Sequence, residues 1–363
     1  MTRVRGRIVR PGAVITGHLE VDGPVILEVA ESLHEESDFV VPGFVDLHCH
    51  GGGGHTFTTG EAGSAERAAA FHLAHGTTTL LAGLVSSPFE LMRAAVEAFR
   101  PLVEEGVLGG LHFEGPYLSA ARCGAQNPVF LRDPVPDELR VLAGDGVTRM
   151  MTIAPELPGA IEAISLLAGA GVVAAVGHTD ATYEQTLAGI EAGATVATHL
   201  CNGMRPIHHR EPGPVTAALA TPPVVCELIA DGIHLHDGML AFAARAAGPH
   251  RSALITDAID AAGMPDGDYE LGGQTVTVAD RVARIATGSI AGSTLTMDAA
   301  LRRAVGAGIP IEDACLMAAT TPARVLGLAD QTGALEAGLR ADLVVLSSSL
   351  QVKRVMRAGR WVV

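Results

Sequence analysis

Residues 44–50 read FVDLHCH, a short apolar run that ends in two histidines. It is the first of eight runs that are rich in β-branched residues and are separated by segments with helical spacing. The runs are FVDLH from 44, TTTLL from 77, GGLHFE from 109, VTRMMTI from 147, VVAAVGH from 172, ATVATH from 194, VCELIAD from 225 and SALITD from 252. The helical segments are 64–75, 88–105, 158–170 and 182–192. This alternation is typical of parallel βαβ units, and eight units predict a closed α/β barrel over residues 42–332.

The two ends of the chain have a different pattern. Residues 1–41 alternate apolar and polar side chains, and residues 333–363 contain three more short strand-like runs. Both segments predict antiparallel β structure, so we expect the two termini to pair into one small β-sandwich domain. Residues 296–328 are predicted to be helical, with a break at Pro322.

Composition and charge restrict the possible partners. The chain has 363 residues and a formal charge of −15, which disfavours nucleic acid and anionic membranes because these attract clustered Lys and Arg. Five cysteines without a CxxC pair argue for a reducing compartment, and we expect the cytoplasm. No apolar segment typical of a secretory signal follows the basic N-terminus, and the longest apolar stretch, 163–177, is too short to span a bilayer.

Polar side chains stand at the ends of the predicted strands. They are His48 and His50 after the first run, Glu114 in the third, His178 in the fifth, His199 in the sixth, Asp231 and His234 after the seventh, and Asp257 in the eighth. The carboxyl ends of all strands in a parallel barrel lie on one side, where active sites of this fold are built. We therefore expect these residues to converge.

The donor types at these strand ends favour a metal site. An isolated strand-end histidine is more often a hydrogen-bonded structural residue, and Glu114 before Gly-Pro alone is typical of a surface acid. The occurrence of several such residues at one end of the predicted barrel makes metal ligands the better interpretation. His48 and His50 are two apart, so both rings project from a strand toward the same side, and His178 and His199 add further nitrogen donors. Zinc is the first choice, with iron, manganese or cobalt as alternatives.

Asp257 ends a buried apolar run, where an unpaired carboxylate is costly. One interpretation is a helix N-cap, because aspartate caps well. The other is catalysis, in which the carboxylate takes a proton from attacking water and returns it to a leaving group. We favour catalysis.

Several motifs carry a family resemblance. PGFVDLHCHGGGG, HFEGPY, GHTDATYEQ, THLCNGM, HHREPG, DGIH, ITDA and AGSTLTMD occur in this order from about residue 40 onward. The chain resembles the N-acetylglucosamine-6-phosphate deacetylase family of the amidohydrolase superfamily. The resemblance implies a distorted TIM-like (β/α)8 barrel with a small β-sandwich, a homodimer, and metal-dependent removal of acetate from an acetylated amino-sugar phosphate.

The resemblance also implies roles for individual residues. Glu114, His178 and His199 match the ligands of the metal that is always found in the family. His48 and His50 match a pair that holds a second metal in some members, so one or two ions per subunit are expected. The only lysine, Lys353, lies in the terminal β segment and cannot supply the carbamylated bridge of many binuclear relatives, so Glu114 is the substitute.

Asp257 matches the catalytic acid and base, and the loops after the sixth and seventh strands match the substrate contacts. Arg210 suits a phosphate, with backbone donors at Asn202 and Gly203, although an isolated loop arginine is usually part of a surface ion pair. His234 matches a contact to a sugar hydroxyl.

The sequence departs from the family pattern at three places, one of which is LVSS after the second strand, where relatives often have PT. Gln126 stands where relatives have a substrate-binding histidine, and its neutral amide stabilises an oxyanion less well. Gly203 stands where alanine is common. The leading hypothesis is hydrolysis of N-acetylglucosamine 6-phosphate to glucosamine 6-phosphate and acetate. The alternatives are N-acetylgalactosamine 6-phosphate or an unphosphorylated acetyl sugar as substrate, or a non-catalytic sugar-phosphate sensor.

Overall fold

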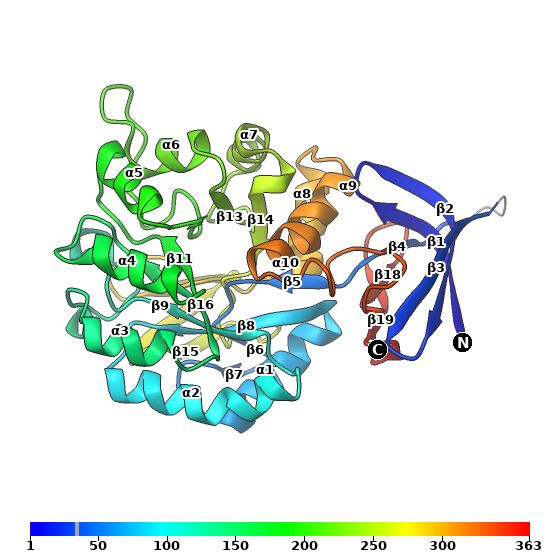
Figure 1. The fold of residues 1–363 in the computed structure, drawn as a ribbon, viewed down its shortest axis with the longest axis horizontal. Coiled ribbons are helices and arrows are strands. Elements are labelled where there is room, and N and C mark those ends of the chain that lie inside the picture. Colours follow the sequence, from blue (N-terminus) through cyan, green and yellow to red (C-terminus); the bar gives the residue numbers. More distant parts are fainter. Residues whose placement is uncertain (33–35) are drawn as a thin grey trace.

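The computed structural model describes residues 1–32 and 36–363, and a parallel β barrel forms its larger part (Figure 1). The barrel sheet has eight strands, in the order β14-β13-β12-β11-β10-β9-β8-β5. These strands are β5 (Phe44–Asp46), β8 (Thr77–Val85), β9 (Gly110–Glu114), β10 (Thr148–Ile153), β11 (Val173–Val176), β12 (Val196–Ala197), β13 (Val225–Ile229) and β14 (Ser252–Ile255). The first residue of each strand lies within two residues of the first residue of a predicted run, so the predicted α/β barrel is confirmed.

The barrel closes where the first and last strands end. Beyond β5 and β14, the amide of Asp257 donates to the carbonyl of His48 at 2.8 Å, and the amide of His50 donates to the carbonyl of Ala258 at 2.7 Å. These bonds join residues that follow β5 and β14, and not the two strands themselves, so the barrel is less regular at this point. Closure therefore brings residues 48–50 directly beside Asp257.

Helices cover the outside of the barrel because their apolar faces need burial against the sheet. They are α1 (Ala62–Ala74), α2 (Phe89–Glu104), α3 (Pro136–Ala143), α4 (Ala160–Gly169), α5 (Tyr183–Glu191), α6 (Gly213–Ala220), α7 (Asp237–Ala247) and α8 (Met297–Gly306). After α8 come α9 (Ile311–Cys315), the π-helical turn η4 (Leu316–Thr320) and α10 (Thr321–Val325). Pro322 lies in the first turn of α10, so the predicted break is a change of helix type there.

The two termini meet in one seven-stranded sheet beside the barrel (Figure 1). Its strands are β1 (Thr2–Arg10), β2 (Ala13–Asp22), β3 (Val25–Glu31), β4 (Phe39–Pro42), β18 (Leu343–Leu346), β19 (Val352–Arg357) and β20 (Arg360–Trp361). β4 pairs parallel with β1 and antiparallel with β18. The sheet is therefore mixed, whereas the sequence predicts a purely antiparallel one. The domain limits 1–41, 42–332 and 333–363 stay a prediction.

A small sheet between β14 and α8 was not predicted. It consists of β15 (Gly267–Leu271), β16 (Gln274–Ala279) and β17 (Val282–Ile285), which pair antiparallel. Its apolar side chains pack with Val85 at the end of β8 and with Ile259. The sheet therefore lies over the carboxyl ends of the barrel strands. Among the described residues, no helix is long and apolar enough to cross a membrane.

Candidate metal centre

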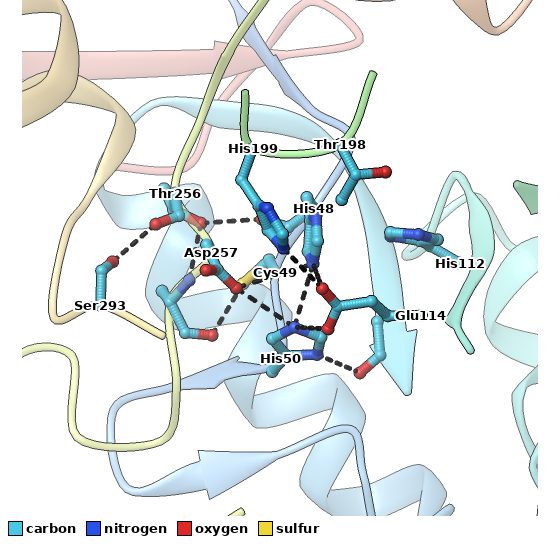
Figure 2. Close-up of polar contacts among 12 residues, drawn as sticks. His48, Cys49, His50, His112, Glu114, Thr198, His199, Thr256, Asp257 and Ser293 are labelled. Carbon is cyan, nitrogen blue, oxygen red and sulfur yellow. Dashed lines mark hydrogen bonds and ion pairs between the residues drawn. The ribbon is translucent and has the colours of Figure 1, made fainter. Parts of the chain in front are cut away.

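The predicted strand-end residues converge at the carboxyl end of the barrel, and Figure 2 shows five of them facing one another. Glu114 is the last residue of β9, and the others lie two to five residues beyond their strands. The candidate donors form two groups in which the ligand atoms lie within 4.8 Å of one another. The first group is Glu114, His178 and His199, and the second is His48, His50 and Asp257. All six side chains are buried.

Glu114 connects the two groups. Its Oε1 lies 2.9 Å from Nε2 of His178 and 2.8 Å from Nε2 of His199. Its Oε2 lies 3.3 Å from Nε2 of His50 in the second group. In that group, Nε2 of His50 lies 3.1 Å from Nε2 of His48 and 3.2 Å from Oδ1 of Asp257. One carboxylate thus faces both groups, with one oxygen toward each.

The outer nitrogens of the four rings support metal binding. In three rings, Nδ1 faces a backbone carbonyl oxygen. The distance from Nδ1 of His178 to the oxygen of Arg122 is 2.8 Å. The corresponding distances are 3.2 Å from His199 to Asn202 and 3.1 Å from His50 to Gly83. A carbonyl only accepts hydrogen bonds, so each Nδ1 carries the proton and each Nε2 offers a lone pair toward the centre. His48 has a carboxylate, Glu227, in place of the carbonyl. The residues therefore fit a divalent cation.

Both carboxylates of the centre are ionised at neutral pH. Burial opposes the charge of Glu114, but His48 and His178 hold its pKa well below the usual range. Burial likewise opposes the charge of Asp257, but His48 and His50 lower its pKa to about 2. Asp257 is therefore available as a proton acceptor.

The backbone at three of these strand ends is strained. His178, His199 and Asp257 have φ angles of 46°, 26° and 49°, in the left-handed region that residues with a side chain rarely adopt. Strain of this kind persists only where the surrounding contacts enforce it, and it is concentrated at functional sites. The turns direct the two imidazoles and the carboxylate into the barrel mouth.

A cavity of about 270 Å³ opens above the two groups. Its walls include most of the predicted substrate contacts, namely Gln126, Asn202, Gly203 and His234, together with His50, Glu114, His178, His199 and Asp257. Leu271, in the unpredicted sheet, lines the same cavity. Arg210 is the exception: it is exposed, does not line the cavity, and contacts Nε2 of His209 at 2.7 Å.

The amide of Gln126 is held by two partners. Its Oε1 accepts from the backbone N–H of Ser86 at 2.7 Å, and its Nε2 donates to Oε2 of Glu114 at 2.6 Å. This fixes the orientation of the amide and steadies the carboxylate that joins the two groups. An amide nitrogen has two hydrogens, so one donor remains for a ligand in the cavity. The sequence did not reveal the link to Ser86, because it depends on how two loops pack.

His234 is held by the turn that contains it. Its Nδ1 lies 2.7 Å from Oδ2 of Asp231, whose Oδ1 accepts from the backbone amides of Ile233 and His234 at 2.8 Å. Burial opposes the charge of His234, but Asp231 raises its pKa. The ring of His234, the predicted hydroxyl contact, is therefore held in a fixed orientation at the cavity wall.

Gly115, directly after Glu114, provides a stability prediction. Its φ is +89°, and an added Cβ would lie 2.4 Å from Oγ of Ser86 and 2.9 Å from Leu118. We expect Gly115→Ala to lower the free energy of unfolding by about 2–4 kcal/mol, from the positive φ and from overpacking. Urea denaturation of metal-free protein measures the change.

Gly146 is the matched control for this substitution, because its φ is +75° and, in the part of the chain that the structure describes, no atom beyond its chain neighbours lies within 4 Å of an added Cβ. Gly146→Ala isolates the backbone cost and should destabilise less. Equal losses in the two variants would contradict the steric part of the argument.

A parallel barrel with histidine and carboxylate donors at its strand ends is the architecture of a metal-dependent barrel enzyme. The model of the "Amidohydrolase family" matches residues 39–362, and the chain belongs to this family. The Lysinibacillus sphaericus N-acetylglucosamine-6-phosphate deacetylase is 35% identical over 357 residues, covering 96% of this chain and 90% of the relative. The Escherichia coli O157:H7 N-acetylgalactosamine-6-phosphate deacetylase is 36% identical, covering 93% of this chain and 90% of the relative.

Solved structures agree with these relatives. The crystal structure of N-acetyl-D-glucosamine-6-phosphate deacetylase from Mycobacterium smegmatis has a TM-score of 0.96 and 46% identity, with all of both chains covered. A mutant of that protein in complex with N-acetyl-D-glucosamine-6-phosphate has a TM-score of 0.95 and 46% identity over 99% of both chains. The family resemblance and the distorted TIM-like fold predicted from the motifs are confirmed.

Proposed function

We propose that this chain hydrolyses the amide of N-acetylglucosamine 6-phosphate, giving glucosamine 6-phosphate and acetate. The observation that carries the proposal is the ionised Asp257 carboxylate, which lies 3.2 Å from Nε2 of His50 at the floor of a cavity lined by Gln126 and His234. Incubating metal-replete protein with this substrate should release acetate. The absence of acetate would refute the substrate assignment.

The residues of the cavity divide the reaction between them. Glu114, His178 and His199 would hold one divalent ion, and His48, His50 and Asp257 would hold a second. A bound ion would polarise the acetyl carbonyl and lower the pKa of the attacking water. Asp257 accepts the proton of that water and then donates it to the departing sugar amine. His234 donates to the sugar, and Gln126 keeps Glu114 in place while offering its second N–H to the acetyl group.

The donor set supports zinc as the first choice, with iron, manganese and cobalt as alternatives. We propose two ions per subunit, because the second group is as complete as the first and Glu114 faces both. Metal analysis of the purified protein tests both the identity and the number.

We also propose a homodimer in which Arg210 acts across the subunit interface. Arg210 is exposed and lies outside the cavity of its own subunit, on the loop between β12 and α6. In such a dimer the guanidinium of Arg210 would contact the phosphate of a substrate bound in the partner subunit, because a guanidinium binds phosphate in a bidentate manner. Sedimentation of the purified protein tests the dimer.

Arg210→Ala should lower kcat/KM for the 6-phosphorylated substrate about 10–100-fold, because a hydrogen bond to a charged group contributes about 1.5–3 kcal/mol. Turnover of unphosphorylated N-acetylglucosamine should not change. Arg93, an exposed arginine on α2, is the control. An equal loss on both sugars would contradict a phosphate role.

A second candidate substrate is N-acetylgalactosamine 6-phosphate, which the name of the Escherichia coli relative supports. Acetate release from the two epimers at equal concentration distinguishes them.

All six metal-ligand candidates are present, and Asp257, the proposed acid and base, is one of them. This complete set argues against a non-catalytic sensor. The five cysteines are free, which supports the cytoplasm as the location.

A further inference from the structure

Glu227 is a buried acid that the proposed reaction does not use. It is the third residue of β13 and is fully buried. Its Oε2 lies 3.2 Å from Nδ1 of His48 and also 3.2 Å from the backbone nitrogen of His199. Within residues 1–32 and 36–363, its Oε1 has no hydrogen-bond partner. A buried carboxylate with an unsatisfied oxygen is costly, so its retention needs an explanation.

The other three histidines of the centre indicate what Glu227 does. Backbone carbonyls hold Nδ1 of His50, His178 and His199, and they fix the tautomer in which Nε2 has a free lone pair. His48 is the one ring among the four whose Nδ1 faces a side chain. The ability of His48 to ligate through Nε2 therefore depends on a group that a substitution can remove.

Glu227 also joins the two groups of donors. His199 belongs to the first group, and its backbone is strained, with φ of 26°. Its backbone N–H donates to Oε2 of Glu227, the same oxygen that contacts Nδ1 of His48 in the second group. The two rings lie 5.4 Å apart between their centroids, and Figure 2 shows them side by side. One carboxylate oxygen thus orients a ring in one group and a backbone turn in the other.

We propose that Glu227 is a positioning residue that holds His48 ready to bind the second metal ion. This inference rests on the proposal of two ions per subunit. Outer carboxylate partners of ligating histidines typically change metal affinity about 10–100-fold when they are removed. Because Glu227 contacts the ring of His48 but only the backbone of His199, its loss should weaken the second ion selectively.

Glu227→Gln tests the inference, because glutamine keeps the size of the side chain and one acceptor oxygen but removes the negative charge that makes the His48 ring a more basic ligand. Metal-free full-length protein is titrated with Co²⁺, and visible absorption and equilibrium dialysis follow each equivalent. The native protein should bind two equivalents. The variant should bind the first with native affinity and the second about 10–100-fold more weakly.

Asp298→Asn is the matched control. Asp298 is a buried carboxylate that contacts His75 and Arg302 outside the metal centre. Its loss should change stability and leave both Co²⁺ affinities native. If Glu227→Gln does not fold, Glu227→Asp replaces it, because the shorter side chain keeps the charge but cannot reach both partners.

Three results would overturn the inference. They are two native affinities in the Glu227 variant, an equal weakening of both equivalents, and a native protein that binds one equivalent only. The last would refute the second site and leave acetate release as a separate test of the deacetylase proposal. A second equivalent that weakens alone would support it.

Discussion

Replacing Asp257 with asparagine is expected to lower kcat about 10³–10⁴-fold, near the upper limit for a group that acts as general base and general acid. Asparagine has nearly the same shape, so the cavity stays intact, but its amide cannot accept the proton of the attacking water. The low pKa of Asp257, about 2, means that the native carboxylate is ionised throughout the neutral range. Initial rates of acetate release measure the loss.

Two controls isolate the proton-transfer role. Asp257 also belongs to the second group of candidate ligands, so the metal content of Asp257→Asn must be measured beside its rate. Asp260, three residues further on, does not line the cavity, and Asp260→Asn should keep most of the activity. Substrate affinity should be nearly native in Asp257→Asn. A rate loss that disappears when excess metal restores full occupancy would contradict the assignment.

The barrel was predictable because its strands have a strong pattern. Fully buried parallel strands appear in sequence as short apolar runs, and the helices between them have a different period. The sheet of residues 267–285 was missed because it is an insertion whose strands are partly exposed: Tyr269 is half-buried and Thr275 is exposed. Its position over the cavity follows from packing against Val85, which no local pattern reveals.

The site was predictable to the extent that it follows from barrel geometry. Strand ends on one side of a barrel must meet, so Glu114, His178 and Asp257 could be brought together from the order of the runs alone. The orientation of the side chains could not. The left-handed backbone at His199 and the link between Glu227 and His48 depend on strand register and on contacts between residues far apart in the chain.

Glu114 is the residue whose loss should affect both groups of candidate metal ligands. Its Oε1 faces His178 and His199, and its Oε2 faces His50. The only lysine of the chain, Lys353, contacts Asp38 beside the terminal sheet, so it cannot take over the bridging role. A neutral side chain at position 114 would remove the anionic oxygens that face both groups of donors.

We therefore expect Glu114→Gln to lose bound metal from both groups and to lower kcat on the order of 10³-fold or more, since a catalytic metal contributes several kcal/mol to the transition state. Metal analysis after dialysis and the rate of acetate release measure the two effects. Gln126→Leu is a graded comparison, because it removes the hydrogen bonds to Oε2 of Glu114 and to the N–H of Ser86 but leaves the carboxylate itself in place, so it should weaken metal binding less. If Glu114→Gln kept one tightly bound ion and lost the other, the two groups would be independent sites. Glu114 would then serve one of them, and its nearness to His50 would reflect packing alone.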